Sequence, residues 1–219
     1  MAINRRPDMH EVDWSVYLVT DPVLVGHRNL TEVVTAAIRG GVRVVQYRDK
    51  DASTREMVAM AAELAAVCRR MGAWFLVNDR LDVALAVDAG GVHVGQDDMP
   101  VATARRLLGP DKLLGVSVHN EAEIHQAELD GADHVSLSPI FATPTKPDHQ
   151  IPLGLQGVRT LSRLARVPVI AIGGIHAGNA AEVIRAGARG ICVVSAIIAA
   201  PDPEQAAREL KQAVTGAAA

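Results

Sequence analysis

One short segment combines residue types that suit the binding of a phosphorylated ligand. It is Gln46-Tyr47-Arg48-Asp49-Lys50, in which an arginine and a lysine are two residues apart. Side chains of an extended strand alternate between its two faces, so Gln46, Arg48 and Lys50 point to the same side. An arginine can hold a diphosphate through its planar fork while a lysine acts as a point charge. This segment therefore predicts a diphosphate-binding site.

Two acidic segments could supply the ligands of a metal ion. Asn78-Asp79 and Asp97-Asp98 each follow a short apolar run. Magnesium takes oxygen ligands and commonly binds through one or two carboxylates plus substrate phosphates, which suits Asp79 with one of Asp97 and Asp98. The alternative is that Asp79 and Asp98 are N-caps of the helices that follow, because aspartate is common at that position. Spacing alone leaves both interpretations open.

Later segments add hydroxyl groups, glycines and another lysine. Ser117 ends an apolar run and can donate a hydrogen bond to a phosphate oxygen. The loop over residues 138–149 contains Thr143-Pro144-Thr145-Lys146, and long loops in compact folds are often binding loops. Gly173-Gly174 and Val194-Ser195 follow the last two apolar runs, where the backbone can approach an anion. These segments predict a phosphate subsite.

The polar segments lie at the ends of regularly spaced apolar runs. Eight short β-branched runs alternate with longer alanine-rich helical patterns along the chain. We expect strands over residues 15–20, 43–47, 74–77, 91–94, 113–117, 134–137, 168–172 and 190–194. Eight consecutive β/α units predict a single-domain α/β protein with a closed (β/α)8 barrel, the TIM-barrel fold. The loops after the strands of such a barrel meet at one face, so the polar segments would form one site.

Local signals support this organisation. The clearest helix is expected over residues 53–71, with Ser53 as its N-cap, Glu56 three residues later and Gly72 after its end. An open doubly wound sheet is the alternative, but the first expected strand ends without a glycine-rich phosphate-binding turn. We assign residues 14–219 to the barrel and residues 1–13 to a flexible N-terminal segment.

The composition restricts the classes of partner. The 219 residues include 22 Lys and Arg and 25 Asp and Glu, for a net charge of −3. No basic run is present that could bind nucleic acid or an anionic membrane. The longest apolar runs are shorter than the roughly 20 residues that cross a bilayer. We expect a cytoplasmic protein that acts on small molecules, and a homo-oligomer is compatible with the sequence.

Taken in order, these motifs resemble those of the thiamine phosphate synthase family over nearly the whole chain. The family's QxRxK, ND, HxGQxD and TxTK elements are present as Gln46, Arg48 and Lys50; Asn78 and Asp79; His93, Gly95, Gln96 and Asp98; and Thr143, Pro144, Thr145 and Lys146. Between Asp97 and Asp98, the resemblance favours Asp98. The sequence departs from the family pattern at Tyr47, where leucine is commoner, and at Ser136-Leu137-Ser138-Pro139, where GxGP is frequent.

The resemblance implies a transferase. In this family, 4-amino-2-methyl-5-(diphosphooxymethyl)pyrimidine loses diphosphate, and the nitrogen of a thiazole phosphate, carboxylated or not, captures the methylene carbon to give thiamine phosphate. The resemblance implies one Mg²⁺ per subunit on Asp79 and Asp98. It assigns the leaving diphosphate to Arg48, Lys50, Ser117 and Lys146, and the pyrimidine to Gln46 and Asn78. It assigns the thiazole phosphate to the residues Thr143, Pro144, Thr145, Gly174, Val194 and Ser195.

Two other functions fit parts of the pattern. A thiazole tautomerase is a relative on the same barrel that would use His119 as an acid or base. It needs neither a diphosphate clamp nor a pair of magnesium ligands. A non-catalytic sensor of phosphorylated ligands is the second alternative. The complete set of charged motif residues favours the synthase over both. His93 and His134 lie within expected strands and are interpreted as core groups.

Overall fold

Eight parallel strands form a closed barrel at the centre of the molecule. The computed structural model describes residues 12–143 and 151–218. Each strand pairs with the next in the chain, and β8 pairs with β1. The strands are β1 Val16–Val19, β2 Val44–Tyr47, β3 Trp74–Asn78, β4 Gly91–Val94, β5 Leu113–Val118, β6 His134–Leu137, β7 Val169–Ile172 and β8 Gly190–Val193. The predicted single-domain (β/α)8 barrel is confirmed, and the open-sheet alternative is wrong.

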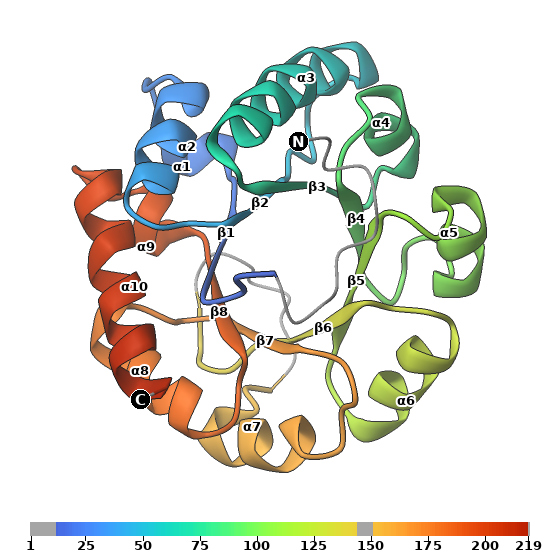
Figure 1. The fold of residues 1–219 in the computed structure, drawn as a ribbon, viewed down its shortest axis with the longest axis vertical. Coiled ribbons are helices and arrows are strands. Elements are labelled where there is room, and N and C mark those ends of the chain that lie inside the picture. The colour runs from blue at the N-terminus through green and yellow to red at the C-terminus, as the bar shows by residue number, and fades with distance from the viewer. Residues whose placement is uncertain (1–11, 144–150, 219) are drawn as a thin grey trace.

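Helices form a ring outside the barrel (Figure 1). They are α1 Pro22–Val25, α2 Leu30–Arg39, α3 Thr54–Met71, α4 Leu81–Ala86, α5 Val101–Leu108, α6 Glu121–Leu129, α7 Gly154–Ser162, α8 Ala177–Arg185, α9 Ser195–Ile198 and α10 Pro203–Ala218. The N-terminal cap predicted for α3 is present, since the Ser53 and Glu56 side chains each accept from the other's backbone N–H. Gly72 ends α3 in the left-handed conformation at φ 69°. In the described parts of the chain, no helix combines the length and apolar character of a membrane span.

Side chains of the strands alternate between the inside of the barrel and the layer under the helices. Val16 and Leu18 pack in the outer layer, whereas Tyr17 and Val19 belong to a separate apolar cluster inside the barrel. Tyr47 also faces the outer layer and is 2% exposed. The unusual tyrosine at this position therefore packs beneath the helices and leaves its two neighbours to face the barrel interior.

Two histidine rings fill the barrel interior beside Gly115. A Cβ atom at Gly115 would lie 2.3 Å from His93 Nδ1 and 2.4 Å from His134 Nε2, so no other residue fits there without displacing a ring. The two ring centroids are 5.6 Å apart, and the His134 centroid lies 4.5 Å from that of Trp14. Burial lowers the pKa of His93 to about 4 and lowers the pKa of His134 as well. Both rings are buried in the barrel core, as predicted, and burial favours their neutral form.

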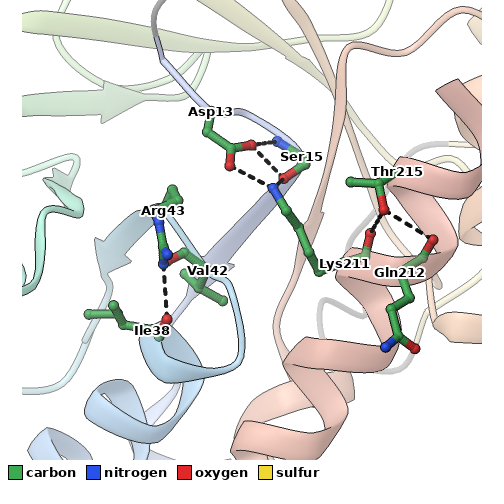
Figure 2. A network of polar contacts seen from close by, with 8 residues as sticks. All are labelled: Asp13, Ser15, Ile38, Val42, Arg43, Lys211, Gln212 and Thr215. Atoms are coloured by element: carbon green, nitrogen blue, oxygen red, sulfur yellow. Dashed lines mark hydrogen bonds and ion pairs between the residues drawn. The ribbon is translucent and has the colours of Figure 1, made fainter. Parts of the chain in front are cut away.

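Polar contacts tie the start of β1 to α10 (Figure 2). Lys211 Nζ donates to Asp13 Oδ2 at 2.6 Å and to Ser15 Oγ at 2.5 Å. Val12 is 3% exposed and packs with Trp14 inside the barrel. Residues 12 and 13, which we assigned to the flexible segment, therefore pack with the barrel. Residues 1–11 lie outside the described part of the chain.

Candidate active site

A cavity of about 190 Å³ opens at the end of the barrel where the strands finish. Its lining includes residues that follow or end each of the eight strands, which is where active sites of such barrels lie. Ten predicted site residues line it: Gln46, Arg48, Lys50, Asn78, Asp79, Asp98, Ser117, Thr143, Gly174 and Val194. Ser195 is exposed and is not among the lining residues. Pro144, Thr145 and Lys146 lie outside the described residues.

The end of β2 and the residues after it present polar side chains to the cavity, as predicted. Gln46, Arg48 and Lys50 line the cavity, while Tyr47 points away from it. The Gln46 side chain is almost fully buried, and its Nε2 donates to Tyr17 Oη at 2.8 Å. This side of the cavity therefore combines two cations with an amide that is held from below by a buried tyrosine.

Asp79 and Asp98 lie together at the cavity, although they come from different loops. Burial raises the pKa of Asp79 to about 6, and a hydrogen bond with Asp98 and the charge of Asp98 act in the same direction. The positive charge of Lys50 and a hydrogen bond with Asn78 oppose this shift. Two carboxylates that repel each other favour either a shared proton or a bound cation.

Neither acid caps a helix. The N-cap position of α4 is Arg80 and that of α5 is Pro100, and neither helix has a side-chain cap. Asp79 instead has φ 59°, a left-handed conformation that aspartate tolerates better than most residues. Asp98 Oδ2 accepts a hydrogen bond from Gly95 N at 2.7 Å, which closes the turn after β4. The N-cap interpretation of these two acids is therefore wrong.

Ser117 lines the cavity and is held by two neighbouring side chains. Its Oγ lies 3.0 Å from His93 Nε2, and its carbonyl oxygen accepts from Gln96 Nε2 at 2.6 Å. His119, two residues later, is not among the cavity-lining residues, and its Nδ1 lies 3.0 Å from Glu123 Oε2. The Asn120 side chain accepts from Glu123 N and caps α6.

The glycines after β7 are needed for packing as well as for access to the cavity. Gly174 has φ 64°, and a Cβ atom there would lie 2.7 Å from Ala142 O. Asn179 Nδ2 donates to Gly174 O at 3.0 Å, which ties this turn to α8. The loops after β6 and β7 therefore lie in direct contact, and both contribute to the cavity.

Several cavity residues were not predicted. They are mostly small or apolar side chains on or beside the strands: Val19, Thr20, Ser136, Ser138, Ile172 and Cys192. The period of two identifies some of them, because Val19 and Cys192 share the inward face with Tyr17. Thr20 carries no charge, and neither its spacing nor the family resemblance assigned it a role in the site. Burial raises the pKa of the Cys192 thiol, so this cysteine is not a reactive nucleophile.

Within residues 12–143 and 151–218, no three His, Cys, Asp or Glu side chains gather as metal ligands. The carboxylates of Asp79 and Asp98 are the acidic groups that line the cavity. A pair of protein carboxylates is the usual number for magnesium that also binds substrate phosphates. The arrangement therefore suits a metal ion whose coordination is completed by a ligand.

Comparisons with known proteins agree with the geometry. A family model described as thiamine monophosphate synthase matches residues 16–197. A curated thiamine-phosphate synthase of Chloroflexus aurantiacus is 58% identical over 206 residues, which cover 94% of this chain and 95% of that protein. The thiamine-phosphate synthase of a Roseiflexus species is 50% identical over 202 residues, covering 92% and 86%.

Solved structures give the same result. Thiamine phosphate pyrophosphorylase from Pyrococcus furiosus superimposes with a TM-score of 0.87 at 38% identity, covering 95% of this chain and 98% of that one. A 3-hexulose-6-phosphate synthase superimposes with a TM-score of 0.67 at 20% identity, covering 91% and 99%. The second likeness shows a shared barrel fold alone.

Proposed function

Because the chain belongs to the thiamine monophosphate synthase family, and so is a transferase that forms thiamine phosphate, we propose how its cavity carries out this reaction. The substrates are an aminopyrimidine that carries a diphosphate on its methylene group and a thiazole phosphate. The bond from the methylene carbon to the diphosphate oxygen breaks, and the thiazole nitrogen supplies the electron pair of the new carbon–nitrogen bond. The products are thiamine phosphate and inorganic diphosphate.

Two residues after β2 and one near the end of β5 stabilise the leaving diphosphate. Arg48 and Lys50 line one side of the cavity and provide positive charge for the oxygens that become more negative as the bond breaks. Ser117 lines the cavity, where its hydroxyl can donate to a diphosphate oxygen while His93 holds it at 3.0 Å. Lys146, which lies outside the described residues, is proposed to add a fourth contact to the same group.

One observation carries this proposal: two carboxylates share the cavity with Arg48 and Lys50. Asp79 and Asp98 would repel an anionic substrate unless a cation lay between them and the diphosphate. Their oxygen atoms are the ligands that magnesium prefers, so the residues present fit this ion. When bound, Mg²⁺ would supply positive charge that neutralises the departing diphosphate. Asp98 is already oriented for this role by its hydrogen bond to Gly95 N.

The remaining cavity residues orient the two rings. Gln46 and Asn78 are proposed to bind the pyrimidine, because both are inward-facing amides beside the two cations. Thr143, Gly174 and Val194 line the cavity from the loops after β6, β7 and β8 and are proposed to bind the thiazole phosphate, together with the undescribed Pro144 and Thr145. Ser195 does not line the cavity, so it would contact the thiazole phosphate only if the phosphate group extended beyond the cavity. Correct alignment of the two rings is itself a large part of the catalysis.

The position of His119 disfavours the tautomerase alternative. That reaction requires an acid or base in contact with the substrate, whereas His119 pairs with Glu123 at the start of α6 and does not line the cavity. A sensor would not need the pair of acids beside the two cations. The cytoplasmic location and the homo-oligomeric state stay predictions.

The direct test is to mix the purified protein with both substrates and to follow thiamine phosphate by mass spectrometry. Turnover is expected with Mg²⁺ and is expected to stop after chelation. The Asp98→Asn variant should lose at least about 100-fold in kcat/KM, since it removes one proposed metal ligand. The Asp51→Asn variant changes an exposed acid near the same face and should behave as the wild type. Full turnover without any divalent ion would refute the proposed role of the acids.

A further inference from the structure

We propose that Thr20 is a positioning residue that holds Arg48 in place for the leaving diphosphate. Thr20 directly follows β1, is fully buried and lines the cavity. Its side chain contacts Arg48, which lies 28 positions later in the sequence. The proposal rests on the function assigned to Arg48 above and extends it to a strand that contributes no predicted substrate contact.

A single hydroxyl group satisfies both backbone polar groups of Arg48. Thr20 Oγ1 accepts a hydrogen bond from Arg48 N at 2.9 Å and donates one to Arg48 O at 3.3 Å. Buried backbone groups are costly to leave without a partner, so both contacts restrain the chain at this point.

The contacts occur where the strand ladder stops. Thr20 N donates to Gln46 O at 2.9 Å, and β2 ends one residue later, at Tyr47. Arg48 therefore begins the loop, where no further strand bonds to β1 fix its backbone. At Arg48, the hydrogen bonds with the Thr20 hydroxyl replace the backbone bonds that a strand residue would make with β1. Both backbone polar groups of Arg48 therefore have a hydrogen-bond partner, although its side chain belongs to the cavity.

Asp21, the residue after Thr20, lies near the guanidinium group of Arg48. Asp21 Oδ2 lies 4.0 Å from Arg48 Nη1. Asp21 Oδ1 accepts from Val23 N and Leu24 N, both at 2.9 Å, so this carboxylate is fixed at the start of α1. A separation of 4.0 Å orients the guanidinium by charge without forming a close hydrogen bond. Thr20 and Asp21 thus hold the backbone and the side chain of Arg48 respectively.

Tyr17 extends the same arrangement to the preceding residue of the motif. Its buried hydroxyl accepts from Gln46 Nε2 at 2.8 Å. Three side chains from β1 and the two residues after it, those of Tyr17, Thr20 and Asp21, therefore contact Gln46 or Arg48, although none of them is a cation or a proposed metal ligand. Of these three, Thr20 is the contact whose loss would displace Arg48 most directly, because it bonds the backbone of Arg48 itself.

The test compares substitutions that keep or remove the hydroxyl. Thr20→Val keeps the shape of the side chain and removes both bonds, so the dissociation constant of inorganic diphosphate, measured by calorimetry at fixed Mg²⁺, should rise about tenfold. The KM of the pyrimidine diphosphate should rise with it, while the KM of the thiazole phosphate should not change. Thr20→Ser keeps the hydroxyl and should bind diphosphate as the wild type does. Thr20→Ala provides the same comparison if the valine variant does not fold.

Thr35→Val is a matched control, because the Thr35 hydroxyl also bonds a backbone carbonyl, that of Thr31, at 2.7 Å, but within α2. It should leave diphosphate binding unchanged. If Thr20→Val and Thr20→Ala lower only the melting temperature and bind diphosphate normally, the positioning role is refuted.

A double substitution separates this inference from the proposed function. Arg48→Met should weaken diphosphate binding, and adding Thr20→Val to it should weaken binding no further, because Thr20 acts through Arg48. If Arg48→Met binds diphosphate normally, the assigned function of Arg48 fails and the inference fails with it. If Arg48→Met weakens binding and the two substitutions prove additive, only the inference about Thr20 is overturned.

Discussion

Replacing Asp79 by asparagine should stabilise the protein in the absence of metal while abolishing its metal-dependent activity. Asparagine has nearly the same shape and readily adopts the left-handed conformation found at Asp79, φ 59°, so the backbone is not expected to change. The substitution removes one of the two negative charges that lie together at the cavity. It therefore removes the charge whose burial, together with its repulsion by Asp98, raises the pKa of Asp79.

The magnitude follows from the shift of this pKa from 3.8 to about 6. Two pKa units correspond to about 3 kcal/mol of folding free energy, but Asp79 is only half-buried, so we expect about 1–1.5 kcal/mol after allowing for solvent screening. For a chain of this length the melting temperature should rise by roughly 2–6 °C.

The sign of the pH dependence provides a second check. The folded state binds the proton of Asp79 more tightly than the unfolded state does, so the wild type loses stability as pH rises from about 4 to about 6. The Asp79→Asn variant lacks this loss. The two proteins should therefore have similar stability near pH 4, and the variant should be more stable at pH 7.5.

Thermal unfolding in metal-free buffer, followed by circular dichroism at both pH values, measures this difference. Adding Mg²⁺ and inorganic diphosphate should then stabilise the wild type more than the variant, because only the wild type retains both proposed ligands. Asp51→Asn removes the same charge from an exposed position and should change neither result. A variant that is no more stable than the wild type at pH 7.5 would show that neither the burial of the Asp79 charge nor its repulsion by Asp98 costs folding free energy.

Three further substitutions test individual assignments. Lys146→Ala should lower kcat more than it raises the KM of the thiazole phosphate; an effect on that KM alone would contradict its role at the diphosphate. Ser117→Ala should lower kcat about tenfold, because one hydrogen bond to the leaving group is lost, and an unchanged kcat would remove Ser117 from the mechanism. His119→Asn should cause only a modest loss of turnover, since His119 does not line the cavity; complete inactivation would restore a proton-transfer role.

The barrel could be predicted because the spacing of the apolar runs and the residues at the helix ends both indicate it. The expected strands match the observed ones to within one residue at each end. The α3 signals at Ser53, Glu56 and Gly72 are local, and local hydrogen bonds decide helix ends. The positions of Arg48 and Lys50 followed from the period of two alone. Assigning the second metal ligand to Asp98 instead of Asp97 required the family resemblance.

The contacts beneath the site could not be predicted. Thr20 contacts Arg48 across 28 residues, and nothing in the composition of the segment after β1 indicates this bond. His93 was expected to be a core group, but its contact with Ser117 depends on the register of β4 and β5. Gly115 has no polar side chain at all, and its importance lies in the space that it leaves for two rings. Such contacts depend on tertiary packing and appear only when the strands are placed side by side.

The central claim is that Asp79 and Asp98 together hold a divalent ion against the departing diphosphate. Crystals grown with Mn²⁺ and inorganic diphosphate, examined by anomalous diffraction, test it directly. A peak between the two carboxylates that also contacts the diphosphate is the predicted result. A peak at another position, or diphosphate bound in the cavity with no metal beside these two acids, would contradict the account.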